Sequence, residues 1–262
     1  MSSRSNHRAE APPSKIAGRI PATDALKAGE VYVWRLPLTA DEDEFGRLRD
    51  VLSEPELARI ERWPEEGARR RRIVCWGRVR RILAELLGCA AGSVPLIRDA
   101  RGRPLLDRRS ADLCLSLSHS GGWALLAISI GARVGIDIER VRPIGDAGRL
   151  SERFLSPAEA KRVLNREDVP AAFFRAWTRK EALIKGLGLG VPGGLGLVSV
   201  VETDGGDLIV EPPHEGWTVV DVDPPEGYAA SIAVESPVPM LRLFEVGLDT
   251  TAARRHWRGC AG

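Results

Sequence analysis

A repeated order of sequence patterns constrains this chain more than any other feature. An eight-residue strand pattern follows a glycine-containing turn twice, as WALLAISI (123–130) after HSGG and as YAASIAVE (228–235) after PPEG. Each copy is preceded by a helical segment and then by a longer one. Such a repeat favours two similar α/β halves related by a pseudo-two-fold axis, with a ligand cleft where they meet. We therefore expect an α+β fold that divides near Gly131.

Local patterns predict the individual elements of the two halves. VYVWRLPL (31–38) predicts a strand, and the stretch from EPELARIERW to Leu87 predicts helices that end at Gly88. LCLSLS (113–118) and WALLAISI predict a hairpin, with VGIDIERV as a short strand directly after it. In the second half, SPAE (156–159) has the pattern of a capping box and PAAFFRAWTRKEALIKGLG predicts a long helix. GLVSVVE, WTVVDVD and YAASIAVES predict strands of one antiparallel sheet.

These patterns divide the chain into an arm and two halves. Residues 1–25 lack periodicity and predict a mobile N-terminal arm. The N-terminal half is expected at 26–131 and the C-terminal half at 132–262, with a tail from about residue 237.

Composition indicates a globular protein without a membrane span. Of the 262 residues, 44% are hydrophobic and 28% charged, and the apolar runs are shorter than the roughly 20 residues that cross a bilayer. MSSRSNHRAEAPPSK has no apolar segment like that of a signal peptide, so we expect a cytoplasmic location. The net charge of +2 argues against a protein that coats nucleic acid. An arginine-rich helix, with Arg69–Arg72 at its start, nevertheless predicts contact with something anionic.

Two carboxylates share one face of the strand VGIDIERV. The strand period of two places Gly135, Asp137 and Glu139 on one face and the two isoleucines on the other. The carboxylates are then about 7 Å apart, a separation that suits a hard cation such as Mg²⁺. Gly135 is expected to leave room for a bulky group beside them. A solvated sheet face would show the same alternation.

Other candidate residues are ambiguous when each is taken alone. In WTRKEALIKG the helical period stacks Trp177, Glu181 and Lys185, which is also the pattern of a surface salt bridge. Ser118 and His119 lie in a turn whose hydroxyls and amides could surround an anion, and Arg103 in RGRPLLD could contact phosphate. The glycines at 188, 190 and 193 spell G-x-G-x-x-G but follow a helix, so we interpret them as a helix C-cap and a loop.

Together these motifs resemble the signature of the Sfp-type 4′-phosphopantetheinyl transferase superfamily. VGIDIERV matches its apolar-G-apolar-D-apolar-E motif, and WTRKEALIKG matches W-[S/T]-x-K-E-[A/S]-x-x-K about forty residues later. SLSHS and the G-R-P turn at 102–104 match two further motifs. The resemblance covers roughly residues 55–235 and implies the family's pseudo-dimeric fold.

The resemblance also implies a role for each matching residue. Asp137, Glu139 and Glu181 would hold Mg²⁺ against the pyrophosphate of coenzyme A, with Asp137, Glu181 and Lys185 as the catalytic residues. Glu181 would accept the proton of a carrier-protein serine, and Lys185 would neutralise phosphate charge. The cofactor-binding residues would be Arg72, Arg103, Ser118, His119 and Lys185. His119 and Arg103 would bind the 3′-phosphate with help from one of Arg69–Arg72, for which Arg72 is the first choice.

The implied function is transfer of 4′-phosphopantetheine from coenzyme A to a serine of an apo acyl carrier protein or peptidyl carrier domain, with release of 3′,5′-ADP. We expect a monomer without nucleic-acid or membrane partners, because the duplicated halves already form the cleft. The alternatives are another Mg²⁺-dependent phosphoryl or phosphodiester enzyme that uses the same carboxylates, and an arginine-rich nucleic-acid-binding module. The first is disfavoured by the small net charge and by the lack of aromatic residues interleaved with the arginines, and the second gives the carboxylates no role.

Overall fold

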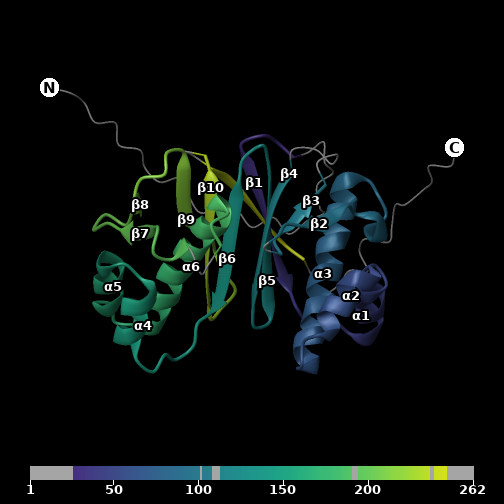
Figure 1. Cartoon of the computed structure of the whole chain (residues 1–262), viewed down its shortest axis with the longest axis horizontal. Helices are drawn as coiled ribbons and strands as arrows, with labels where there is room; N and C mark the ends of the chain where they lie inside the picture. The colour runs from purple at the N-terminus through teal and green to yellow at the C-terminus, as the bar shows by residue number, and fades with distance from the viewer. Residues whose placement is uncertain (1–25, 101, 108–112, 191–193, 237–238, 247–262) are drawn as a thin grey trace.

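The computed structural model contains the same run of elements twice (Figure 1). It describes residues 26–100, 102–107, 113–190, 194–236 and 239–246; the predicted arm, Gly193 and the end of the tail lie outside these residues. The first run is β1 (Glu30–Pro37), α1 (Glu42–Arg49), α2 (Glu54–Glu61), α3 (Glu66–Leu87), a 3₁₀ turn (Ala91–Ser93), β2 (Leu96–Arg98), β3 (Pro104–Leu106), β4 (Leu113–Ser120) and β5 (Trp123–Ile130). The second is β6 (Val134–Arg140), α4 (Ala147–Phe154), α5 (Pro157–Leu164), α6 (Val169–Leu187), β7 (Ser199–Glu202), β8 (Leu208–Glu211), β9 (Trp217–Asp221) and β10 (Tyr228–Glu235).

Each half builds its sheet in the same strand order. β1, β5 and β4 are neighbours in the first sheet, and β6, β10 and β9 are neighbours in the second, with antiparallel pairing throughout. The pairs β2–β3 and β7–β8 form a small separate hairpin in each half. This correspondence confirms the predicted α+β fold of two similar halves.

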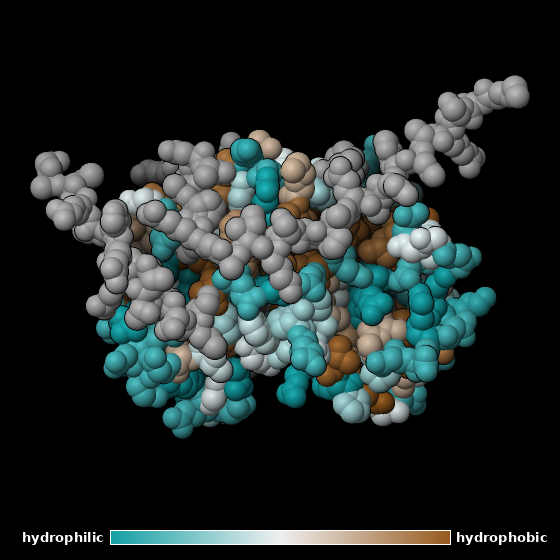
Figure 2. Space-filling view, turned by 180° about the vertical axis from the view of Figure 1, so that it is seen from behind, coloured by the Kyte–Doolittle hydropathy of each residue, from teal (hydrophilic) through white to brown (hydrophobic). Residues whose placement is uncertain are grey.

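The molecule has four layers, in the order helix, sheet, sheet, helix (Figure 1). Alternation along β1 sends Tyr32, Trp34 and Leu36 into the core beneath α3, whereas Val31 and Val33 join a second core between the two sheets. Ile136 and Ile138 of β6 enter the core between the sheets from the other half. The face shown in Figure 2 is largely hydrophilic over the helices at both ends, as expected for helices whose apolar sides turn toward the sheets.

The long helix of each half is bounded by the same local signals. The preceding helix begins with a capping box, Ser53 with Glu56 in α2 and Ser156 with Glu159 in α5. The long helices α3 and α6 both end at a left-handed glycine, with φ of 64° at Gly88 and 73° at Gly188. The predicted helix ends and the SPAE capping box are therefore confirmed.

Some sequence predictions need correction. β7 pairs with β8 and does not join the sheet of β9 and β10 as predicted. β11 (Met240–Glu245), from the predicted C-terminal tail, runs parallel to β1 and so belongs to the sheet of the first half. No helix in the described part of the chain is long and apolar enough to cross a membrane.

Much of the charge of the arginine-rich helix is neutralised within the protein. Arg78 is buried and donates to Glu44 at 2.8 Å, and buried Arg80 donates to Glu56 at 2.9 Å. Arg70 pairs with Glu42 at 2.9 Å and Arg71 with Glu65 at 3.3 Å. These carboxylates come from the same half as the helix, and the contact of its remaining arginines with an anion stays a prediction.

Candidate active site

Strand β6 presents its carboxylates toward helix α6. Ile136 and Ile138 face the core between the sheets, so Gly135, Asp137 and Glu139 occupy the opposite face, as the strand period predicts. A Cβ on Gly135 would lie 2.1 Å from the carbonyl oxygen of Ala182 and 2.3 Å from the nitrogen of Gly186. The room that Gly135 leaves beside the carboxylates is therefore filled by the backbone of α6.

Helix α6 brings Glu181 and Lys185 to these carboxylates. Lys185 Nζ lies 3.4 Å from Glu181 Oε2, so the predicted salt bridge between the two is present. The same Nζ donates to Asp137 Oδ1 at 2.5 Å and to Ser118 Oγ at 3.0 Å. Asp137 is only 1% exposed. Lys185 therefore joins the helix, strand β6 and strand β4 of the other half at one point.

Alternation along β4 divides the SLSHS motif between two sites. Ser118 Oγ donates to Asp137 Oδ1 at 2.6 Å, and Ser120 Oγ donates to Glu139 Oε2 at 2.7 Å. His119 lies on the other face of the strand, where Arg72 Nη1 donates to its Nε2 at 3.3 Å. The serines thus contact the carboxylates, and the histidine contacts α3.

The cluster of Asp137, Glu139, Glu181 and Lys185 is electrostatically strained. Burial, together with the charge of Asp137, raises the pKa of Glu181 to about 7. Burial also raises the pKa of Glu139, against the lowering effect of the hydrogen bond from Ser120. Burial alone would lower the pKa of Lys185, but the charges of Asp137 and Glu181 outweigh it and raise that pKa. Three carboxylates and one ammonium leave two negative charges uncompensated when all are ionised.

The donor set fits a hard divalent cation. Asp137 Oδ2 is buried and has no hydrogen-bond partner, so it keeps lone pairs for a ligand. Carboxylate oxygens are the ligands that Mg²⁺ prefers, and its charge would balance the cluster. In the described part of the chain, no group of three or more His, Cys, Asp or Glu is gathered closely enough to hold a metal as it stands. The ammonium of Lys185 lies among these oxygens, and Glu139 is held by Ser120.

A second feature, a cavity of about 300 Å³, adjoins His119 in the first half. Its walls include Trp63, Arg72, Trp76, Arg98 and His119. The Arg72 guanidinium stacks on Trp63 at 3.6 Å, and that of Arg98 stacks on Trp76 at 4.4 Å. The cavity therefore combines aromatic faces with two cations, which suits an anionic ligand that has a flat apolar part.

His119 is neutral near neutral pH in this setting. Its ring keeps an exposed face, but desolvation against the cavity wall lowers its pKa to about 4, and the charges of Arg72 and Lys185 add to the effect. The hydrogen bond from Arg72 to Nε2 places the remaining proton on Nδ1.

Of the arginines at the start of α3, Arg72 contacts a predicted site residue. Arg69 donates to the carbonyl groups of Trp63 and Pro64, and Arg70 and Arg71 pair with acidic residues as described above. Arg103 lies elsewhere, because its guanidinium donates to the carbonyls of Lys185 at 3.0 Å and Val134 at 3.2 Å. It ties the end of α6 to β6, and its phosphate contact stays a prediction.

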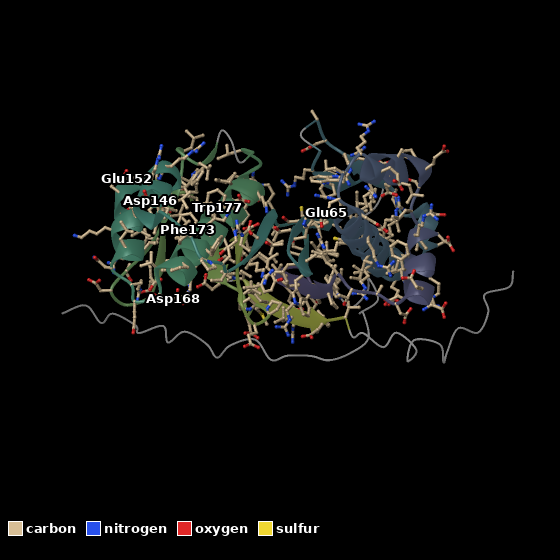
Figure 3. All side chains as sticks on the ribbon, turned by 90° about the horizontal axis from the view of Figure 1, so that it is seen from below. Glu65, Asp146, Glu152, Asp168, Phe173 and Trp177 are labelled. Atoms are coloured by element: carbon tan, nitrogen blue, oxygen red, sulfur yellow. The ribbon has the colours of Figure 1, made fainter. Side chains whose placement is uncertain are left out.

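Two residues of the WTRKEALIKG motif support the site without entering it. Lys180 is buried and donates to Glu159 Oε2 at 2.9 Å, so it fixes α6 to α5. Trp177 packs edge-on against Phe154 at 5.1 Å and stacks with Phe173 at 6.3 Å. Figure 3 shows Trp177 and Phe173 together on α6, with Glu65 of the first half well away from them. Within the stripe, Trp177 therefore packs in the core of its half, whereas Glu181 and Lys185 lie in the carboxylate cluster.

Sequence reasoning placed Ser120 near an anion but missed its contact with Glu139, and it missed three residues of the cavity wall. The contact of Ser120 could have been found from strand alternation, which places it on the same face as Ser118. Trp63, Trp76 and Arg98 had no local signal, because they come from the α2–α3 connection, from α3 and from β2, which only the fold brings together.

Comparison with known proteins agrees with this geometry. The sequence profile described as the 4′-phosphopantetheinyl transferase superfamily matches residues 133–233, which span β6, α6 and most of β10. The 4′-phosphopantetheinyl transferase HetI of Nostoc sp. is 35% identical over 219 residues, covering 82% of this chain and 91% of HetI.

Two Bacillus proteins are also similar. The 4′-phosphopantetheinyl transferase psf-1 of Bacillus pumilus is 31% identical over 200 residues, covering 74% of this chain and 83% of psf-1. The transferase Sfp of Bacillus subtilis is 24% identical over 216 residues, covering 81% of this chain and 93% of Sfp. This chain therefore belongs to the 4′-phosphopantetheinyl transferase superfamily, whose members transfer the phosphopantetheine arm to carrier proteins.

Proposed function

We propose that this protein takes the 4′-phosphopantetheine arm from coenzyme A and releases 3′,5′-ADP, with Mg²⁺ held by Asp137, Glu139 and Glu181. The acceptor is a serine hydroxyl of an apo acyl carrier protein or peptidyl carrier domain. The observation that carries the proposal is the meeting of Ser118, Asp137, Glu181 and Lys185, four motif residues from three elements, at the junction of the halves.

The metal assignment is supported by the unpartnered Oδ2 of Asp137 and by the excess negative charge of the cluster. When bound, Mg²⁺ withdraws charge from phosphate oxygens and so favours attack at phosphorus. Lys185, on α6, contacts the pyrophosphate and adds a positive charge beside the same phosphate oxygens. Its ammonium lies against Asp137 and Glu181, and a cation held by these carboxylates would free it to contact the phosphates.

Glu181 is the general base of the transfer. It accepts the proton of the carrier serine while the serine oxygen forms a bond to the phosphorus that bears the pantetheine arm, and the bond from that phosphorus to 3′,5′-ADP breaks. The other contributions of the protein are positioning and charge stabilisation.

The nucleotide end of coenzyme A lies in the cavity beside His119. Arg72 and His119 contact the 3′-phosphate, and Trp63 or Trp76 offers an aromatic face for the adenine. Ser118 joins this cavity to the carboxylate cluster, because it precedes His119 on β4 and contacts Lys185. For Arg103 the backbone contacts favour a role in holding Lys185, with any phosphate contact secondary.

We further propose that the protein acts as a cytoplasmic monomer without nucleic-acid or membrane partners. Support comes from the duplication, because one chain supplies β4 and β6, the two strands that meet at the site. The pairing of most basic side chains on α3 with acidic neighbours supports the absence of nucleic acid.

Intact-protein mass spectrometry of two apo carriers tests the proposal. An acyl carrier protein and a peptidyl carrier domain are each incubated with the enzyme and coenzyme A, in Mg²⁺ or in EDTA. We expect one phosphopantetheine to be added in Mg²⁺ and none in EDTA or with Asp137→Ala. An equal gain in EDTA would reject the metal assignment, and no gain on any apo carrier by folded enzyme would reject the reaction.

A further inference from the structure

Alternate serines of β4 face strand β6 of the other half. The N–H of Ile136 donates to Ser116 Oγ at 3.1 Å, and the N–H of Arg140 donates to Ser120 Oγ at 3.1 Å. β4 and β6 belong to different sheets and are not paired by a backbone ladder. At these two points the hydroxyls accept the N–H groups that a ladder would otherwise use.

Ser120 also holds a carboxylate. Its Oγ accepts the N–H of Arg140 and donates to Glu139 Oε2 at 2.7 Å. A hydroxyl has a single hydrogen, so the N–H on its acceptor side leaves that hydrogen free to point at Glu139. Ser116 has the same kind of backbone contact, with the N–H of Ile136 and not with a carboxylate.

Both contacts of Glu139 are to one oxygen. Ser120 donates to Oε2, and Arg142 lies 3.8 Å from the same oxygen, with a side chain that is 60% exposed. Oε1 is the oxygen that these contacts leave for another ligand. Asp137 shows the same arrangement, since Ser118 and Lys185 contact Oδ1 while Oδ2 is unpartnered. Each strand carboxylate is thus held by one oxygen and open at the other.

We propose that Ser120 is a positioning residue of the metal site. Its hydroxyl, oriented by the N–H of Arg140, holds Glu139 Oε2 so that Oε1 stays available to the divalent cation. The first half of the molecule thereby sets the geometry of ligands that belong to the second half. The inference rests on the proposed function, because it requires Asp137 and Glu139 to bind the cation.

The test compares two isosteric variants, Ser120→Thr and Ser120→Val, which differ in the hydroxyl. Mn²⁺ binding to the full chain with coenzyme A present is measured by electron paramagnetic resonance, a readout independent of turnover. Loss of an outer-shell hydrogen bond typically weakens metal binding about 10- to 100-fold, and we expect that loss for S120V. S120T should bind Mn²⁺ close to wild type. Ser116→Ala is the matched control, with a lower melting temperature expected but wild-type Mn²⁺ affinity.

The outcomes separate this inference from the proposed function. One outcome is that D137A weakens Mn²⁺ binding while S120V binds Mn²⁺ with the same affinity as S120T. In that case Ser120 does not position the site, and the inference alone fails. Equal weakening by S116A and S120V would also overturn it, because the serines would then act only through the fold. Absence of Mn²⁺ binding by wild type, or no effect of D137A, would overturn both.

Discussion

The two halves of the molecule share a scaffold but differ at a few positions that decide where chemistry occurs. β5 and β10 each begin after a glycine turn. The first residue of β5 pairs with Pro37 of β1, and the first residue of β10 pairs with Arg140 of β6, so Pro37 and Arg140 are equivalent positions. Counting back from them along β1 and β6 makes Trp34 the counterpart of Asp137 and Leu36 the counterpart of Glu139. Trp34 and Leu36 are fully buried beneath α3, so one half has a closed core where the other has carboxylates.

The helices differ in the same way. Aligning the left-handed glycines Gly88 and Gly188 makes Leu86 the counterpart of Gly186, and Tyr32 of β1 is the counterpart of Gly135. With glycine at both contacts, α6 approaches β6 until a Cβ at Gly135 would clash with its backbone. The comparison teaches that removing two large side chains brings the helix close enough for Lys185 to reach Asp137.

One feature is kept in both halves. In each, the glutamate of the capping box pairs with a buried basic residue eight positions before the helix-ending glycine, Glu56 with Arg80 and Glu159 with Lys180. Because the pair also occurs in the half without a carboxylate cluster, we interpret it as part of the scaffold. The motif lysine Lys180 therefore stabilises the fold, whereas Lys185 is the lysine that we propose for the transfer.

The largest expected effect is on turnover when the base is removed. Glu181→Gln should lower kcat by about 10²- to 10⁴-fold, the usual contribution of a general base. The counterpart in the first half is Arg81, and Arg81→Gln should change kcat by less than about twofold, since the position is remote from the cluster. Rates are measured by carrier modification at saturating coenzyme A. Similar losses in the two variants would contradict the assignment of chemistry to the second half.

The next largest expected effect is a loss of stability when the buried ion pair that occurs in both halves is broken. Glu159→Gln leaves Lys180, whose side chain is 2% exposed, without a charged partner and should cost about 3–5 kcal/mol of unfolding free energy. Glu56→Gln should cost less, because Arg80 also donates to the Ala91 carbonyl. Urea unfolding gives both values. If E159Q kept full stability but lost activity, Lys180 would belong to the chemistry after all.

A methyl group at the close helix contact should separate α6 from β6. Gly135→Ala should cost about 1–3 kcal/mol of stability and, by moving Lys185, about 10²-fold in kcat. Gly77→Ala is the control, because its Cβ would lie 2.6 Å from the Leu48 carbonyl oxygen in the first half and so causes strain away from the site. G77A should lose stability but keep its kcat per folded molecule. Equal losses of kcat would show that overpacking anywhere impairs the enzyme.

A further expected effect is a pH dependence of metal-free stability. Glu181 has a pKa of about 7 in the folded protein against 4.5 as the ordinary value, so it favours folding fully below about pH 4.5. This contribution is lost as pH rises through about 7, at less than about 1.4 kcal/mol per pH unit. The melting temperature of E181Q in EDTA should therefore rise relative to wild type between these pH values. A constant difference would contradict the raised pKa.

Local pattern predicted the parts of the site that lie within one element. The period of two placed Asp137 and Glu139 on one face of β6, and the helical period placed Glu181 above Lys185. The same strand pattern gave no indication that Gly135 faces a helix backbone, because periodicity identifies a face but not what covers it.

Contacts between distant segments were not predictable in the same way. β11 pairs with β1, about two hundred residues earlier in the chain, and no local pattern indicates which strand it joins. The short strands β2, β3 and β8 have three or four residues each, too few for a reliable alternation. The meeting of Arg72 with His119 depends on how α3 lies over β4, which tertiary packing decides.

A crystal structure with coenzyme A and Mn²⁺, with the cation located by its anomalous signal, tests the central claim most directly. We expect one cation bound by Asp137, Glu139 and Glu181 beside the pyrophosphate, with Lys185 moved from Asp137 onto a phosphate oxygen. A cation bound away from these carboxylates, or a pyrophosphate lying against the equivalent face of α3 and β1, would contradict it.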